Sequence, residues 1–93
     1  MAFTKALALA PAITLFPNPA TTTTRLDLTQ LPTGTYQVSL LDATGRVVLN
    51  TTLSAGLTHG LNLNSLASGT YTVLVHGQNG SKTLNLTKRL IKE

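Results

Sequence analysis

An internal repeat with a spacing of 35 residues runs through most of this 93-residue chain. From residue 26 to residue 51, ten of 26 positions are identical to the residue 35 positions later. The best-matched segments are Leu31–Val38 and Leu66–Val73, which share leucine, glycine, threonine, tyrosine and valine in the same order. Each copy predicts a strand, a Leu-x-x-Gly turn, a tyrosine-bearing strand, a glycine hairpin and a further strand. Because one three-stranded unit cannot bury its own apolar face, the repeat predicts two units packed together.

Short runs of alternating apolar and polar residues, each bounded by turn residues, predict about seven strands. The 17 threonines and 18 leucines, together with valine, agree with a strand-rich chain. Thr21–Thr24 is interpreted as a polar bridge, Asp42–Gly45 as a tight hairpin turn, and Gly77–Gly80 as a second hairpin. The expected strands are Ile13–Phe16, Arg25–Leu28, Thr35–Leu41 with Tyr36, Val38 and Leu40 on one face, Arg46–Ser54, a strand around Leu61–Leu63, a sixth ending at His76, and Ser81–Lys92.

These strands predict an all-β protein, an Ig-like antiparallel β-sandwich of about seven strands that contains the two-fold repeat of roughly 35 residues. We expect residues 12–93 to form the single domain and residues 1–11 to be a flexible linker or leader. The run Lys5–Ala10 also has the charge and apolar stretch of a weak signal peptide, which remains an alternative.

The last strand, Ser81–Lys92, carries an irregularity. Leu84, Leu86 and Leu90 share one face, but Lys88 falls on that face as well. We expect an unbroken strand with the three leucines inward; a bulge near Thr87–Lys88 is the alternative.

The composition of the chain excludes most kinds of catalytic and metal-binding site. The chain has no cysteine, two histidines and three acidic residues, Asp27, Asp42 and Glu93. A metal site or a catalytic triad would need ligands, nucleophiles and bases that this set does not supply, and no phosphate-binding motif is present. We therefore expect no enzyme activity, no cofactor, no metal and no small-molecule substrate.

The net charge of +4 is uneven, because four of the seven basic residues lie in the last twelve positions. A nucleic-acid surface normally combines a broad basic face with aromatic side chains, so we expect no nucleic-acid partner. Tyr36 and Tyr71 could stack on a sugar ring, but their valine and leucine neighbours of the same parity favour a place in the core. Gly34 and Gly69, two positions earlier in each copy, are expected to have positive φ.

A set of short motifs follows in a fixed order along the chain. They are P-N-P-A at Pro17, Asn18, Pro19 and Ala20; G-x-Y-x-V at Gly34, Tyr36 and Val38; D-x-x-G-R-x-V at Asp42, Gly45, Arg46 and Val48; L-x-x-L-x-x-G-x-Y-x-V at Leu63, Leu66, Gly69, Tyr71 and Val73; and the tail Lys88, Arg89, Leu90, Ile91 and Lys92. In this order they resemble the C-terminal sorting domain of type A cargo in the type IX secretion system of Bacteroidota, over about residues 12–93. The chain departs from the family in Phe16, where tyrosine is common, in a second hairpin without an acidic residue, and in Glu93 after the basic tail.

The resemblance implies a non-catalytic signal that directs a cargo, attached on its N-terminal side, from the periplasm through the outer-membrane translocon to the surface or medium. A sortase then usually removes the signal, which places the cut in the region of Met1–Ala12 or further upstream. We expect the tail Lys88–Lys92 to contact the translocon or its shuttle subunit, or alternatively Leu90 and Ile91 to complete the core. The motif residues that we interpret as scaffold are Pro17, Asn18, Pro19, Gly34, Tyr36, Val38, Asp42, Gly45, Arg46, Gly69, Tyr71 and Val73.

A different class of function remains open from the residues alone. An Ig-like domain could serve as a binding or structural accessory module of a larger secreted protein, in contact with carbohydrate or protein. Such a module would need an exposed aromatic patch or a polar cleft.

Overall fold

The computed structural model describes residues 12–79 and 82–93, so the expectation of a linker or leader at residues 1–11 lies outside the described residues. The described chain is all β, as predicted. It contains no helix that is long and apolar enough to cross a membrane. The seven strands are β1 (Thr14–Phe16), β2 (Thr23–Asp27), β3 (Thr35–Leu41), β4 (Val47–Ser54), β5 (Thr58–Asn62), β6 (Gly69–Asn79) and β7 (Lys82–Lys92).

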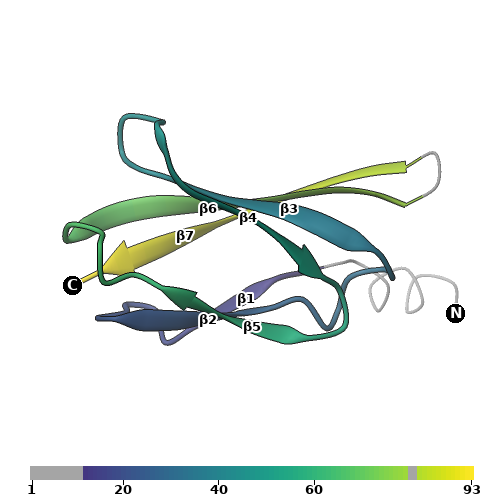
Figure 1. The fold of residues 1–93 in the computed structure, drawn as a ribbon, viewed down its shortest axis with the longest axis horizontal. Coiled ribbons are helices and arrows are strands. Elements are labelled where there is room, and N and C mark those ends of the chain that lie inside the picture. The colour runs from purple at the N-terminus through teal and green to yellow at the C-terminus, as the bar shows by residue number, and fades with distance from the viewer. Residues whose placement is uncertain (1–11, 80–81) are drawn as a thin grey trace, which may run out of the picture.

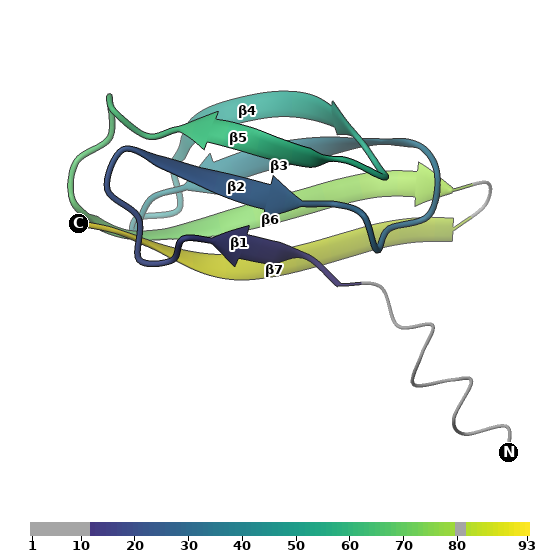
Figure 2. The same ribbon diagram turned by 90° about the horizontal axis from the view of Figure 1, so that it is seen from below.

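The strands form two antiparallel sheets that face each other (Figure 1). One sheet has the order β1-β2-β5, and the other has the order β4-β3-β6-β7. Figure 2 shows β1 beside β7 along one side of the sandwich, with β4 and β5 along the other. The described chain enters toward the end of the sandwich where β7 begins, whereas Glu93 lies at the opposite end. This arrangement confirms the predicted sandwich.

The sheet registers bear on the 35-residue repeat. In one sheet Arg25 of β2 pairs with Gly60 of β5, and in the other Ser39 of β3 pairs with Leu74 of β6. Both pairs join residues that are 35 positions apart. A two-fold axis relating the two copies would pass through such self-matched pairs. The registers are those that a two-fold repeat requires, and the repeat itself stays a prediction.

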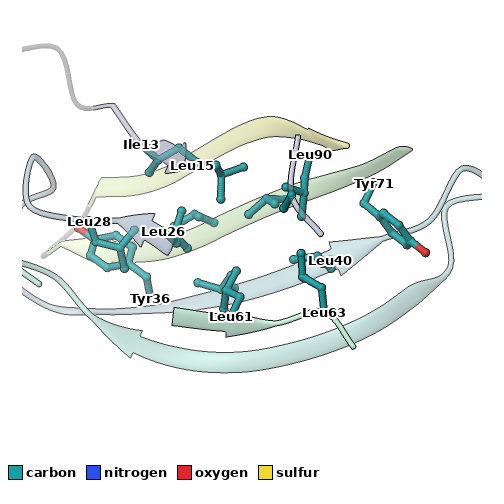
Figure 3. Close-up of a cluster of buried hydrophobic side chains, with 14 of the residues drawn as sticks. Ile13, Leu15, Leu26, Leu28, Tyr36, Leu40, Leu61, Leu63, Tyr71 and Leu90 are labelled. Atoms are coloured by element: carbon teal, nitrogen blue, oxygen red, sulfur yellow. The ribbon is translucent and has the colours of Figure 1, made fainter. Parts of the chain in front are cut away.

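The core lies between the sheets and is almost entirely aliphatic (Figure 3). The period-two pattern explains it, because alternate side chains of each strand point to the same face. Tyr36, Val38 and Leu40 are buried, as predicted from their parity. The other buried apolar residues are Ile13, Leu15, Ala20, Leu26, Leu28, Leu31, Leu61, Leu63, Tyr71, Val73, Val75 and Leu90.

Two boundaries differ from the prediction. The expected polar bridge is wrong in its second half, because Thr23 and Thr24 belong to β2 and Thr24 is fully buried. The threonine hydroxyl is satisfied there, since Oγ1 donates to the carbonyl of Pro17 at 2.9 Å. A buried hydroxyl that has a hydrogen-bond partner avoids most of the desolvation cost of burying a polar group, which allows Thr24 to lie in the core.

The sixth strand does not end at His76, and the hairpin predicted to begin at Gly77 starts too early. β6 continues to Asn79, and Gly77 pairs with Tyr36 on one side and Leu84 on the other. The physical reason is space: a Cβ added to Gly77 would lie 2.6 Å from Cε2 of the Tyr36 ring. Gly77 is therefore a close-packing residue within the strand.

Candidate interaction site at the C-terminal strand

β7 is an edge strand and carries the basic tail. It pairs with β6 without a register shift from Lys82 to Lys92, which confirms the unbroken strand and leaves no bulge at Lys88. Leu90 is fully buried, and Leu84 and Leu86 pack against the core from partly buried positions. The predicted inward face of the strand is therefore confirmed.

The tail residues differ in what they expose. Lys88 and Arg89 are exposed, Ile91 is 39% exposed, and Lys92 is half-buried. Lys88 lies opposite Val73, a buried residue, so it starts on the core side of the sheet edge and reaches solvent with its long side chain. An inward charge on an edge strand also opposes pairing with a second edge.

The outer backbone edge of the tail is covered by the P-N-P-A segment. The Asn18 amide nitrogen donates to the Arg89 carbonyl at 2.8 Å, and the Ile91 N–H donates to the Asn18 amide oxygen at 3.0 Å. The Ala20 N–H donates to the Ile91 carbonyl at 2.8 Å, and the Glu93 N–H donates to the Ala20 carbonyl at 2.8 Å. We call these four hydrogen bonds the tail clamp. They occupy the backbone groups that a partner strand would need at this end of β7.

The segment that makes the tail clamp is held in a bent path between β1 and β2. The peptide bonds that precede Pro17 and Pro19 are both cis. Ala20 is 1% exposed, and the buried Thr24 hydroxyl holds the Pro17 carbonyl. Asn18 itself is exposed, so its two hydrogen bonds lie at the surface.

The D-x-x-G-R motif forms the β3–β4 hairpin turn. The Asp42 carboxylate accepts hydrogen bonds from the Thr44 hydroxyl at 2.6 Å, the Thr44 N–H at 2.9 Å and the Arg46 N–H at 3.1 Å. These bonds, the Thr44 hydroxyl first, lower the pKa of Asp42 because they stabilise the charged form. Gly45 has φ +87°, as the predicted turn requires. The Arg46 guanidinium lies 3.4 Å from the same carboxylate on the exposed surface.

The two Leu-x-x-Gly-x-Tyr motifs make the same local contacts. The Tyr36 hydroxyl donates to the Pro32 carbonyl, and the Tyr71 hydroxyl donates to the Ala67 carbonyl. Both tyrosines are buried, which favours packing over sugar stacking, and Val38 and Val73 are fully buried beside them. The glycines of the two turns, Gly34 and Gly69, have φ +147° and +157°, which confirms the expected positive values.

A shallow cleft of about 460 Å³ lies between the β3–β4 hairpin and the turn before β6. Its lining brings together several motif residues that are distant in sequence, among them Asp42, Arg46, Gly69 and Tyr71. Gly69 pairs with Lys92, so the cleft lies at the same end of the sandwich as the tail. Within residues 12–79 and 82–93, no three histidine, cysteine, aspartate or glutamate side chains are grouped as a metal site.

Comparison with known proteins decides the family. The family described as "Secretion system C-terminal sorting domain" matches residues 14–93, which is most of the chain. This chain belongs to that family. The sorting domain therefore carries a C-terminal signal of type IX secretion, which implies delivery to the cell surface or the extracellular space. No curated protein and no solved structure gave a match.

Thr24 is the residue of the tail clamp region that sequence reasoning missed. Thr24 is in phase with Leu26 and Leu28, so period-two counting could have placed it on the buried face. The hydrogen bonds of Asn18 join residues that are more than 70 positions apart in the sequence, and a local sequence pattern cannot predict a contact of that kind.

Proposed function

We propose that this sorting domain acts as a non-catalytic export signal for a cargo joined to its N-terminal side. The cargo passes from the periplasm through the outer-membrane type IX translocon, and a sortase then removes the signal upstream of β1, in or before residues 1–12. The observation that supports this proposal is the family match over residues 14–93, reinforced by a fold that brings the motifs into one sandwich. No cofactor, metal, nucleic acid or small-molecule substrate enters the proposal.

Recognition by the translocon or its shuttle subunit is proposed to use the exposed side chains of the tail. Lys88, Arg89 and Ile91 are exposed and Lys92 is half-buried, whereas Leu90 is buried and anchors the strand in the core. Backbone pairing with a partner strand is disfavoured from Arg89 onward, because the tail clamp already occupies that edge. Clustered positive charge would instead steer encounter with an acidic surface, and Ile91 would supply apolar area at the contact.

The remaining motif residues are proposed as scaffold. Asn18 holds the tail in place, Asp42 fixes the hairpin, and the two tyrosines fill the core at either end of the sandwich. A scaffold role predicts that substitutions at these positions reduce export only as far as they reduce folding or tail order.

The test fuses the domain to a periplasmic reporter in a host that carries the type IX machinery. Deletion of residues 88–93 is a poor test, because it removes the buried Leu90 and five of the eleven residue pairs between β6 and β7. Point substitutions are cleaner: Lys88→Gln, Arg89→Gln and Ile91→Ser alter exposed side chains, and Arg25→Gln is the matched control on an exposed part of β2.

We expect the tail variants to remain folded and leave the reporter in the periplasm, while Arg25→Gln is exported as the parent is. Normal export of a variant that combines Lys88→Gln, Arg89→Gln and Ile91→Ser would refute recognition by this surface. Periplasmic retention of the parent fusion, with a folded domain, would refute the sorting function itself.

A further inference from the structure

The four sheet edges are protected unequally. β1 is three residues long and runs into Pro17, and β5 is five residues long. β7 carries lysine and arginine and is covered by the tail clamp at its end. β4 is eight residues long, without proline or charge. Natural sheets usually protect a long edge strand with charge, proline or a covering segment, so β4 is the edge of the described chain that remains suited to strand pairing.

The phase of the β4 ladder identifies its outward backbone groups. The Ala55 N–H donates to the Gly34 carbonyl, and hydrogen-bonded pairs alternate along an antiparallel ladder. Every second residue before Ala55 in the register is therefore also hydrogen-bonded to β3, and these residues are Leu53, Thr51 and Leu49. The backbone groups of the residues between them, Asn50, Thr52 and Ser54, face away from the sheet. His59 Nε2 lies 2.8 Å from the Ser54 carbonyl oxygen, which agrees with a Ser54 carbonyl that does not bond to β3.

The same alternation is seen on β7. The tail clamp bonds to the outward backbone groups of every second residue, Arg89, Ile91 and Glu93. On β4 the outward groups of Asn50 and Thr52 have no partner strand among the described residues. They form a row of donors and acceptors that an added strand could satisfy.

The distribution of charge along the chain favours a neutral partner strand at β4. No charged residue occurs from position 47 to position 81, although the chain as a whole is +4. A second copy that pairs through its own β4 would therefore bring neutral residues together. The β7 strands of the two copies would then be seven strand spacings apart, which is about 34 Å at ~4.8 Å for each spacing. That distance exceeds the Debye length of about 8 Å several times, so the basic strands would not repel appreciably.

We propose that two copies of this chain pair antiparallel through β4, with the two-fold axis at Thr51, and form one continuous eight-stranded sheet. This register places Asn50 opposite Thr52 of the second copy, so the outward backbone groups of these two residues are satisfied on both strands. On the core side it places Leu49 opposite Leu53 of the second copy. Both leucines are only partly buried in the single chain, and the pairing covers them. The proposal is independent of the sorting function.

The small area of such an interface limits the stability of the dimer. One pair of eight-residue strands buries less than the roughly 1,200–2,000 Å² of a stable interface, so the dimer is expected to dissociate in the micromolar range or above. Sedimentation velocity of the full 93-residue chain, from about 10 μM to about 1 mM, covers that range. We expect the weight-average mass to rise from monomer toward dimer as the concentration increases.

Two substitutions on the outward positions test the geometry. Thr52→Pro removes an outward N–H, and Thr52→Lys adds charge beside the two-fold axis; both are expected to hold the chain monomeric. Thr87→Lys makes the same charge change on the exposed face of β7 and should dimerise as the parent does. Thermal unfolding verifies that each variant is folded, and Thr52→Lys keeps the test valid if the proline variant is not.

A cross-link then locates the axis. The chain has no cysteine, so Thr51→Cys introduces one thiol at the position where the two strands would place it opposite its own copy. We expect Thr51→Cys to form a disulfide dimer at least tenfold faster than Thr87→Cys under the same mild oxidant. A parent that stays monomeric up to about 1 mM, a dimer that persists in Thr52→Lys, or equal cross-linking of the two cysteines would each overturn the proposal.

Discussion

The contact between Gly77 and the Tyr36 ring allows a quantitative prediction for Gly77→Ala. The added methyl group would lie 2.6 Å from Cε2 and 3.1 Å from Cγ of a ring that is 1% exposed. The ring must therefore move within a filled core, which costs about 1–3 kcal/mol. Movement also endangers the 2.8 Å hydrogen bond from the Tyr36 hydroxyl to the Pro32 carbonyl, which contributes about 0.5–1.5 kcal/mol.

An opposing effect is smaller. Alanine restricts the unfolded chain more than glycine does, which favours folding by about 0.4–1 kcal/mol. The net loss is expected to be about 2–3 kcal/mol, or a fall in Tm of roughly 10–20 °C for a domain of this size. Urea unfolding followed by circular dichroism measures it directly.

Gly60→Ala is the matched control. Gly60 also lies within a strand, but an added Cβ there meets no atom within 4 Å. Its free energy of unfolding should stay the same or rise by less than about 1 kcal/mol. Equal losses for the two variants would show that strand glycines matter here for a reason other than the tyrosine ring.

A double-mutant cycle isolates the ring. On a Tyr36→Leu background the six-membered ring is absent, so Gly77→Ala should cost less than about 1 kcal/mol. If Gly77→Ala costs as much on that background as on the parent, the steric reasoning is refuted.

Three further predictions concern the tail clamp, the repeat and the hairpin. Asn18→Ala should lower stability by about 1–2 kcal/mol and speed hydrogen exchange at the Ile91 amide, while amides in the middle of β3 stay protected; unchanged exchange at Ile91 would contradict the tail clamp. Tyr36→Phe and Tyr71→Phe should each cost about 0.5–1.5 kcal/mol, and costs that differ by more than about 1 kcal/mol would argue against equivalent roles in the two copies. The lowered pKa of Asp42 means that its stabilising effect is present above the ordinary carboxylate pKa, about 3.9, and is lost as the pH falls through the lower folded value. Acid titration of Asp42→Ala should therefore show a shallower loss of stability below about pH 4 than the parent, and parallel curves would contradict this assignment.

The sequence was most informative where a rule is local. Parity alone placed Tyr36, Val38 and Leu40 in the core, and the positive φ of Gly34 and Gly69 followed from the turns in which they occur. Such features depend on a few neighbouring residues, so one sequence suffices to predict them.

The errors share a different cause. Gly77 looked like a turn residue because glycine is common in turns, yet a ring 41 positions earlier in the chain requires its missing side chain. Thr24 looked solvated within a polar run, yet the fold supplies a carbonyl to its hydroxyl. The partners of Asn18 are more than 70 positions away. The environment of each of these residues depends on a neighbour that is close in the fold but not adjacent in the sequence, and a local sequence pattern cannot predict it.

The tail clamp also determines how the domain would respond to mechanical force. β1 and β7 run in the same direction, and the described chain enters toward one end of the sandwich while Glu93 lies at the other (Figure 2). After β1, the segment that makes the tail clamp forms a parallel bridge to β7 between Ala20 and Lys92. A pull on the cargo against a held tail would slide the two segments in opposite directions. The four clamp hydrogen bonds would then be strained together in shear, not opened one after another as in a zipper. The same contacts that order the tail at rest would thus make the domain resist unfolding when it is pulled apart between its two ends.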